Sequence, residues 1–65
     1  MRMSDAAELS ALIGSLDELA RRLAAIAQRY EQPPRDDVLG ALYDAERNLR
    51  TARRRVETSI KILDR

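Results

Sequence analysis

The chain has 65 residues with 12 basic and 11 acidic side chains, and it contains neither Cys nor His. This composition excludes a disulfide framework and a zinc–thiolate site, and it removes the commonest metal ligand and general base. An apolar share of 45%, made largely of Ala and Leu with two Tyr, is typical of packed helices. One short domain with a marginal core is therefore expected, completed by another chain.

The chain order predicts two helices separated by Pro33-Pro34. Ser4 is a suitable N-cap for helix one, predicted over about 4–31, because its hydroxyl can accept a bond from the first turn. The prolines predict a turn at about 32–34, and Pro34 suits the first turn of helix two, predicted over about 34–63. Such a short connection makes the helices antiparallel, so residues 1–65 are predicted to form a single all-α helical hairpin.

Helix one carries three apolar series with a spacing of seven. The first two are predicted to form the seam with helix two, and the third widens the stripe as a flank. In order, the series are Leu9, Leu16, Leu23 and Tyr30; then Leu12, Leu19 and Ile26; then Ile13, Ala20 and Ala27.

Helix two carries a large and a small series, predicted to face the seam. These are Leu42, Leu49, Val56 and Leu63, with Val38, Ala45, Ala52 and Ser59. Apolar side chains beyond the seam predict association, with a homodimeric four-helix bundle favoured over a helical protein partner. The residues assigned to the association surface are Leu39, Tyr43, Ile60, Ile62 and Ile13.

Charge is divided along the chain. Residues 1–46 hold five basic and nine acidic side chains, whereas residues 47–65 hold seven basic and two acidic ones. At 100° per residue, a basic stripe follows the outer side of helix two, formed by Arg47, Arg50, Arg54, Lys61 and Arg65. The stripe has two interpretations. It is either a solvated face with local pairs at Glu46–Arg50 and Glu57–Lys61, or a surface that binds nucleic-acid phosphates.

The remaining polar features favour structural roles. Gly14 and Gly40 are predicted on the outer faces of their helices, where they either allow a close backbone approach or are merely tolerated. Ser59 is expected to bond to a carbonyl one turn back. The adjacent carboxylates of Asp17-Glu18 and Asp36-Asp37 point about 100° apart and cannot share one ion. No catalytic, cofactor-binding or metal-binding residue is predicted, and no small-molecule substrate is expected.

The absence of a long apolar run predicts no membrane span, and the acidic amphipathic start differs from a signal peptide, so a cytoplasmic location is expected. The abundance of Arg and Ala suggests a bacterial or phage origin. The sequence therefore predicts a small non-enzymatic interaction module, an adaptor, regulator or phage-type effector that acts by self-association and protein binding. The alternative is a dimer that binds RNA through the basic stripe.

Overall fold

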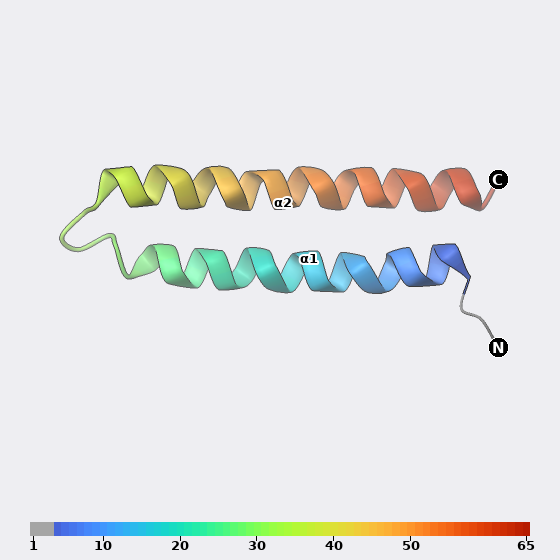
Figure 1. The fold of residues 1–65 in the computed structure, drawn as a ribbon, viewed down its shortest axis with the longest axis horizontal. Coiled ribbons are helices and arrows are strands. Elements are labelled where there is room, and N and C mark those ends of the chain that lie inside the picture. The colour runs from blue at the N-terminus through green and yellow to red at the C-terminus, as the bar shows by residue number, and fades with distance from the viewer. Residues whose placement is uncertain (1–3) are drawn as a thin grey trace.

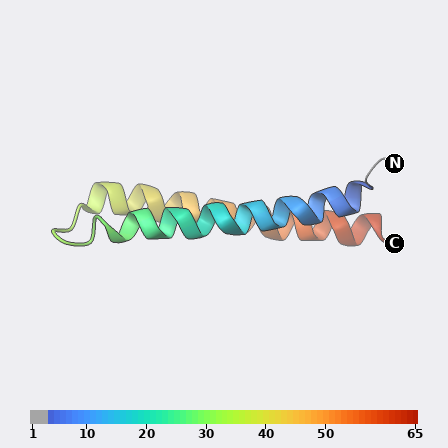
Figure 2. The same cartoon turned by 90° about the horizontal axis from the view of Figure 1, so that it is seen from below.

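The computed structural model describes residues 4–65 and consists of two packed α-helices. Helix α1 spans Asp5–Gln28 and α2 spans Asp36–Leu63; they run antiparallel and are joined by a turn at 29–35 (Figure 1). Seen from below, α2 passes behind α1 from one side to the other, so the helices cross at a shallow angle (Figure 2). The predicted all-α hairpin is confirmed. Within residues 4–65, neither helix is long and apolar enough to cross a membrane.

Helix α1 begins where the sequence predicts it. The Ser4 hydroxyl accepts a hydrogen bond from the Ala7 amide at 3.1 Å, and Asp5 and Glu8 lie in the first turn, where the helix dipole favours negative charge. At the other end, the amides of Arg29 and Tyr30 donate to carbonyls three residues back, each at 3.0 Å. These tighter bonds close the last turn, so α1 ends at Gln28, three residues before the predicted end.

Helix α2 begins at Asp36, two residues later than predicted, because the prolines belong to the turn. The Arg35 amide closes this turn by donating to the Tyr30 carbonyl at 2.9 Å. The Arg35 carbonyl then accepts from Leu39 at 2.9 Å, which is the first bond of the helix. The Arg35 guanidinium also binds the Asp37 carboxylate at 3.0 Å, and this contact lowers the pKa of Asp37 below its ordinary value.

The seam of α1 differs from the prediction. Among the described residues only Ala20 and Ala27 are buried, with exposures of 6% and 1%, and both were predicted to flank the seam. Leu12 and Leu19, predicted to lie within it, are 49% and 45% exposed. The physical reason is that small Ala side chains let α2 approach closely, whereas a row of Leu would hold the helices apart. The hairpin is therefore rotated about the α1 axis relative to the prediction.

The molecule is one layer of helices. Its Cα atoms extend over 50 × 21 × 10 Å, so the shortest dimension holds a single helix. Two helices in one layer can cover only the sides that they turn toward each other. Both broad faces of the hairpin are consequently open to solvent, and their chemistry differs.

Candidate functional site

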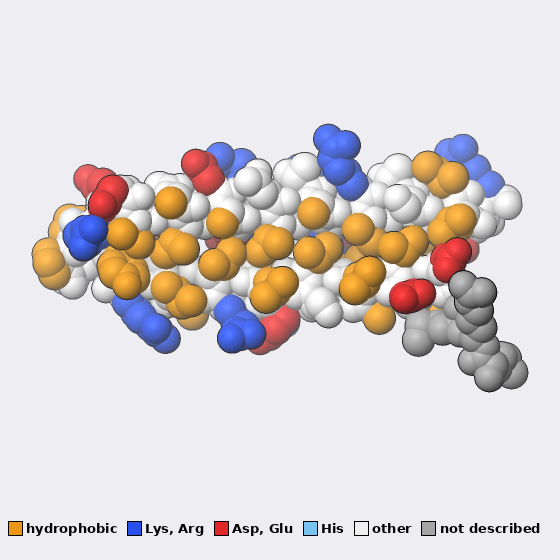
Figure 3. Space-filling model, viewed as in Figure 1, with side chains coloured by type: hydrophobic (Ala, Val, Ile, Leu, Met, Phe, Trp, Pro, Cys, Tyr) orange, Lys and Arg blue, Asp and Glu red, His pale blue; other side chains and the backbone are white. Residues whose placement is uncertain are grey.

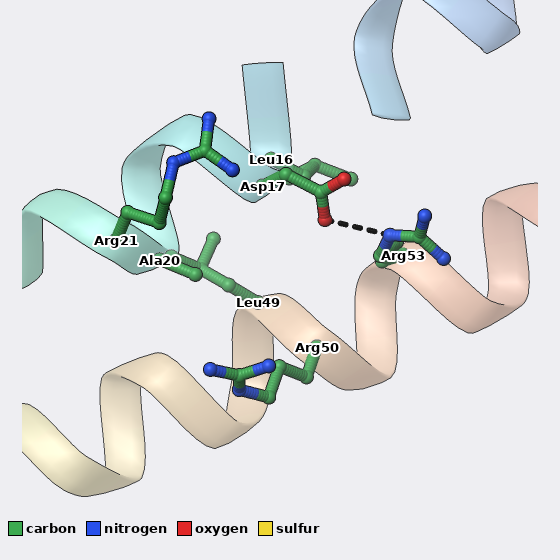
Figure 4. Close-up of a pocket in the computed structure, with 7 residues that line it drawn as sticks. All are labelled: Leu16, Asp17, Ala20, Arg21, Leu49, Arg50 and Arg53. Carbon is green, nitrogen blue, oxygen red and sulfur yellow. Dashed lines mark hydrogen bonds and ion pairs between the residues drawn. The ribbon is translucent and has the colours of Figure 1, made fainter. Parts of the chain in front are cut away.

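One broad face, which we call the clamped face, carries an ion pair between the two helices. The Arg53 Nε of α2 donates to the Asp17 Oδ1 of α1 at 2.6 Å (Figure 4). The same guanidinium also binds Glu57 one turn further along α2. Side chains of both partners in the interhelical pair remain more than a third exposed. Arg53 thus connects two carboxylates and joins the helices near the middle of the hairpin.

A second polar link lies near the turn. The Tyr43 hydroxyl of α2 donates to the Glu31 carboxylate at 3.3 Å. Partial desolvation and the negative charge of Glu31 raise the pKa of Tyr43 above its ordinary value. At 100° per residue, Tyr43 lies about 80° from Arg53 on α2, so both links hold the same side of the hairpin.

A small cavity of about 100 Å³ beside Arg53 has a basic lining. It contains three arginines, but each already binds a carboxylate: Arg21 binds Glu18 at 2.6 Å, Arg50 binds Glu46 at 3.4 Å, and Arg53 binds Asp17. An anion entering here would have to displace these pairs. The cavity is therefore a gap in the clamped face that internal ion pairs neutralise.

The opposite face, which we call the open face, is apolar. Its α1 side consists of Leu12, Leu19 and Ile26, which recur every seven residues on one side of the helix. Leu12 and Leu19 keep nearly half of their surface exposed, and Ile26 is half-buried. Figure 3 shows apolar side chains forming a nearly continuous band along the groove between the helices, with the charged side chains at its outer edges.

The α2 side of the open face is built from small residues and Leu63. Leu63 lines a shallow hollow of about 380 Å³ together with Leu9 and Leu12, which places it on this face. At 100° per residue, Ala45 and Ala52 point within about 20° of Leu63. The open face therefore has large side chains on α1 and mostly small ones on α2.

The predicted association residues do not lie together. Ile13, Leu39 and Ile60 are half-buried, whereas Tyr43 and Ile62 are 43% and 54% exposed. Tyr43 lies on the clamped face, and Ile62 points about 100° away from it on α2. The sequence did contain the signal for the open face, because a single partner helix can cover only two of the three neighbouring apolar series of α1.

The basic stripe is partly neutralised. Arg47 binds Asp44 at 2.9 Å, and the predicted Glu46–Arg50 pair is confirmed at 3.4 Å. The predicted Glu57–Lys61 pair is wrong, because Glu57 binds Arg53 from one turn on its other side. Arg54 donates to the Thr51 hydroxyl at 3.2 Å.

The C-terminal end of the basic stripe differs from its first part in ion pairing. Within residues 4–65, neither Lys61 nor Arg65 forms an ion pair. The two cations follow the mostly paired part of the stripe toward the end of α2. Together with Arg54, which binds only a neutral hydroxyl, they are the members of the stripe whose charge is most available to a ligand.

Other predicted features are placed as follows. A Cβ added to either Gly14 or Gly40 would meet no atom within 4 Å, which confirms that both lie on outer faces. The Ser59 hydroxyl donates to the Arg55 carbonyl at 3.0 Å, as predicted. Tyr30 is exposed beside the turn. In the part of the chain that the structure describes, no group of three or more acidic side chains is placed to hold a metal ion.

Comparison of the chain with protein-family models, curated proteins and solved structures finds no match in any of the three. The two faces and the basic stripe are the features of the hairpin that bear on its function.

Proposed function

We propose that the chain is a small non-enzymatic interaction module that acts in the cytoplasm by self-association and protein binding, as an adaptor, regulator or phage-type effector. Self-association through the open face would complete a four-helix bundle. The supporting observation is that Leu12 and Leu19 remain nearly half exposed while only two alanines are buried among residues 4–65. A hairpin that buries so little is expected to gain most of its core from a second layer.

The energetics favour this proposal. Covering the exposed half of a Leu side chain contributes about 1 kcal/mol, and the open face offers Leu12, Leu19 and Leu63 from each chain. Together with the alanines between them, they form a contiguous apolar surface with charge at its edges. An exposed patch of this kind is typical of interaction sites.

The mass in solution tests the proposal. Light scattering behind size exclusion should give about twice the chain mass of 7.4 kDa, with helical circular dichroism that decreases on dilution. A helical monomer that stays folded on dilution would contradict self-association. The open face would then have to be examined as a site for a different protein.

Binding of nucleic acid is a second candidate function, favoured by the lack of ion pairs at Arg54, Lys61 and Arg65 within residues 4–65. Phosphate contacts release counterions, so such binding should weaken steeply with salt. The double variant Arg54→Gln/Lys61→Gln should then lose affinity for a fluorescent RNA oligonucleotide. Arg21→Gln, which removes a charge from α1, should bind as the unaltered chain does. Equal binding by all three proteins, or binding insensitive to salt, would exclude a role for the stripe.

A further inference from the structure

We infer that the open face is covered by a second copy of this chain whose turn lies at the same end, so that α1 of each chain packs on α2 of the other. The inference depends on the proposed self-association and adds the identity of the face and the orientation of the partner. It follows from the exposed area, from the distribution of side-chain size and from the position of charge.

The exposed area matches that of an unpaired half of a dimer. The chain exposes 5258 Å², whereas a folded monomer of 7.4 kDa is expected to expose about 4,200 Å². The excess of about 1,000 Å² is close to the roughly 800 Å² that each partner buries in a standard protein interface. A second copy on one broad face would cover this amount, and it would convert the single layer into two.

Side-chain size decides the orientation. The side chains of the open face are large along α1, at Leu12 and Leu19, and small along α2, at Ala45 and Ala52. Two identical hairpins can meet face to face with twofold symmetry in two ways. With the turns at the same end, α1 lies over the α2 of the partner and large side chains meet small ones. With the turns at opposite ends, α1 lies over α1 and large side chains meet large ones.

Only the first arrangement keeps the two layers at an even distance, because facing large and small residues interdigitate at interaxial distances of 8–10 Å. The hairpin already follows this rule internally, since Ala20 of α1 and Leu49 of α2 line the same gap between the helices. The opposite-end arrangement would separate the two α1 helices while bringing the two α2 helices together. The layers would then form a wedge that leaves one side poorly packed.

Charge is compatible with this arrangement. Within one hairpin the acidic first half of α1 lies beside the basic second half of α2, where Asp17 binds Arg53. The same-end dimer repeats this pairing between chains, because each α1 half lies over the matching half of the partner's α2. Acidic and basic halves would thus alternate around the bundle at the end away from the turns.

Spin labels at the two ends of the hairpin test the orientation. The chain lacks Cys. Gln32→Cys in the turn and Arg65→Cys at the opposite end of the hairpin therefore each give one labelled thiol per chain. Both positions are exposed. In a same-end dimer the distance between paired labels should be below about 30 Å at both sites, because neighbouring helix axes are only 8–10 Å apart. Opposed turns would give distances approaching the 50 Å length of the hairpin.

The outcomes separate the two proposals. Short distances at both sites support the same-end dimer, since hairpins with opposed turns could slide to bring one pair of labels together but never both. Long distances at both sites, in a protein with the mass of a dimer, overturn the orientation and leave self-association intact. A monomeric mass overturns self-association and the inference together. As a control, Leu19→Glu in the Gln32→Cys chain should abolish the intermolecular signal, while circular dichroism reports whether the helices persist.

Discussion

The two broad faces of the hairpin are built from the same pair of helices but differ in chemistry, since one carries polar contacts and the other is apolar. On the clamped face, Arg53 joins α2 to Asp17 of α1, and Tyr43 binds Glu31 beside the turn. On the open face, Leu12 and Leu19 lie exposed beside a row of alanines. Polar contacts between exposed groups contribute little stability, but they are directional and therefore select one rotation of α1 against α2. Apolar contacts are non-directional and supply most of the energy.

The rotation of α1 explains why its larger side chains, Leu12 and Leu19, lie outside the seam with α2. With Ala20 and Ala27 turned toward α2, the helices approach closely and Arg53 can reach Asp17. The same rotation moves the Leu12 and Leu19 series away from the seam. This geometry leaves the apolar surface of α1 available to a partner. Five substitutions test this division, in order of decreasing expected effect, and two more serve as controls.

The largest effect is expected from Leu19→Glu at the centre of the open face. The substitution places two charges in the proposed dimer interface and removes two Leu side chains that would each contribute about 1 kcal/mol there. The dissociation constant should rise by about 10³-fold or more, and the thermal midpoint should fall with it. Light scattering over a dilution series measures the first change and circular dichroism the second.

Ser10→Glu is the matched control for this substitution. Ser10 is exposed and lies about 180° from Leu19 on α1 at 100° per residue. The substitution adds the same charge to the same helix but outside the open face, so the mass measured by light scattering should stay that of the unaltered protein. If both variants dissociated equally, total charge rather than the open face would control association.

The next largest effect is expected at the outer faces, from Gly14→Ala and Gly40→Ala. Neither new Cβ meets an atom within 4 Å, and Ala favours the helix over Gly by about 0.5–1 kcal/mol. Each substitution should therefore raise the free energy of unfolding by about that amount in urea denaturation. A loss of association in either variant would show instead that another backbone approaches the glycine closely, and it would move the interface away from the open face.

A smaller effect is expected from Arg53→Met on the clamped face. Methionine keeps the helix propensity and most of the stem but removes both ion pairs. Because the Asp17 and Arg53 side chains are more than a third exposed, solvent screens the pair and the loss should be about 0.2–0.5 kcal/mol, in the lower part of the range for exposed pairs. The loss should shrink as salt is added, while the mass stays that of the unaltered protein.

Arg21→Met serves as the control for the clamp. Arg21 binds Glu18 within α1 at 2.6 Å, and both side chains are more than half exposed. It removes an ion pair of the same kind that does not connect the helices, so its effect on unfolding should be smaller than that of Arg53→Met. Equal losses would show that the interhelical position of Arg53 carries no extra stability.

The helical hairpin could be predicted because its signals are local. Ser4 caps α1 as expected, and Pro33-Pro34 interrupts the helical pattern where the turn lies. The helix ends differ by two or three residues, because bonds between the turn's own backbone groups, such as Arg35 to Tyr30, replace the last helical ones. These bonds depend on how the chain closes and have no signature in side-chain spacing.

The orientation of α1 could not be predicted from periodicity alone. Three neighbouring apolar series compete for one partner helix, and the spacing of seven is the same for all of them. The choice depends on contacts between residues far apart in the chain, such as Asp17 with Arg53. The same competition explains the wrong Glu57–Lys61 pair, since Glu57 has basic neighbours one turn away in both directions and binds Arg53.

The smallest effect is expected at the turn end of the hairpin, from Glu31→Gln. Tyr43 donates its hydroxyl hydrogen to Glu31 at 3.3 Å, and the carboxylate raises the pKa of Tyr43. Removing the charge should lower that pKa, which an ultraviolet titration of tyrosinate absorbance can follow, with Tyr43→Phe identifying the remaining signal of Tyr30. The contact is present at neutral pH and is lost as the pH rises through the folded-state pKa of Tyr43, where the ionised phenol can no longer donate and repels the carboxylate. An unchanged titration would show that Glu31 does not interact with Tyr43 in solution, so that this contact does not hold the turn against α2.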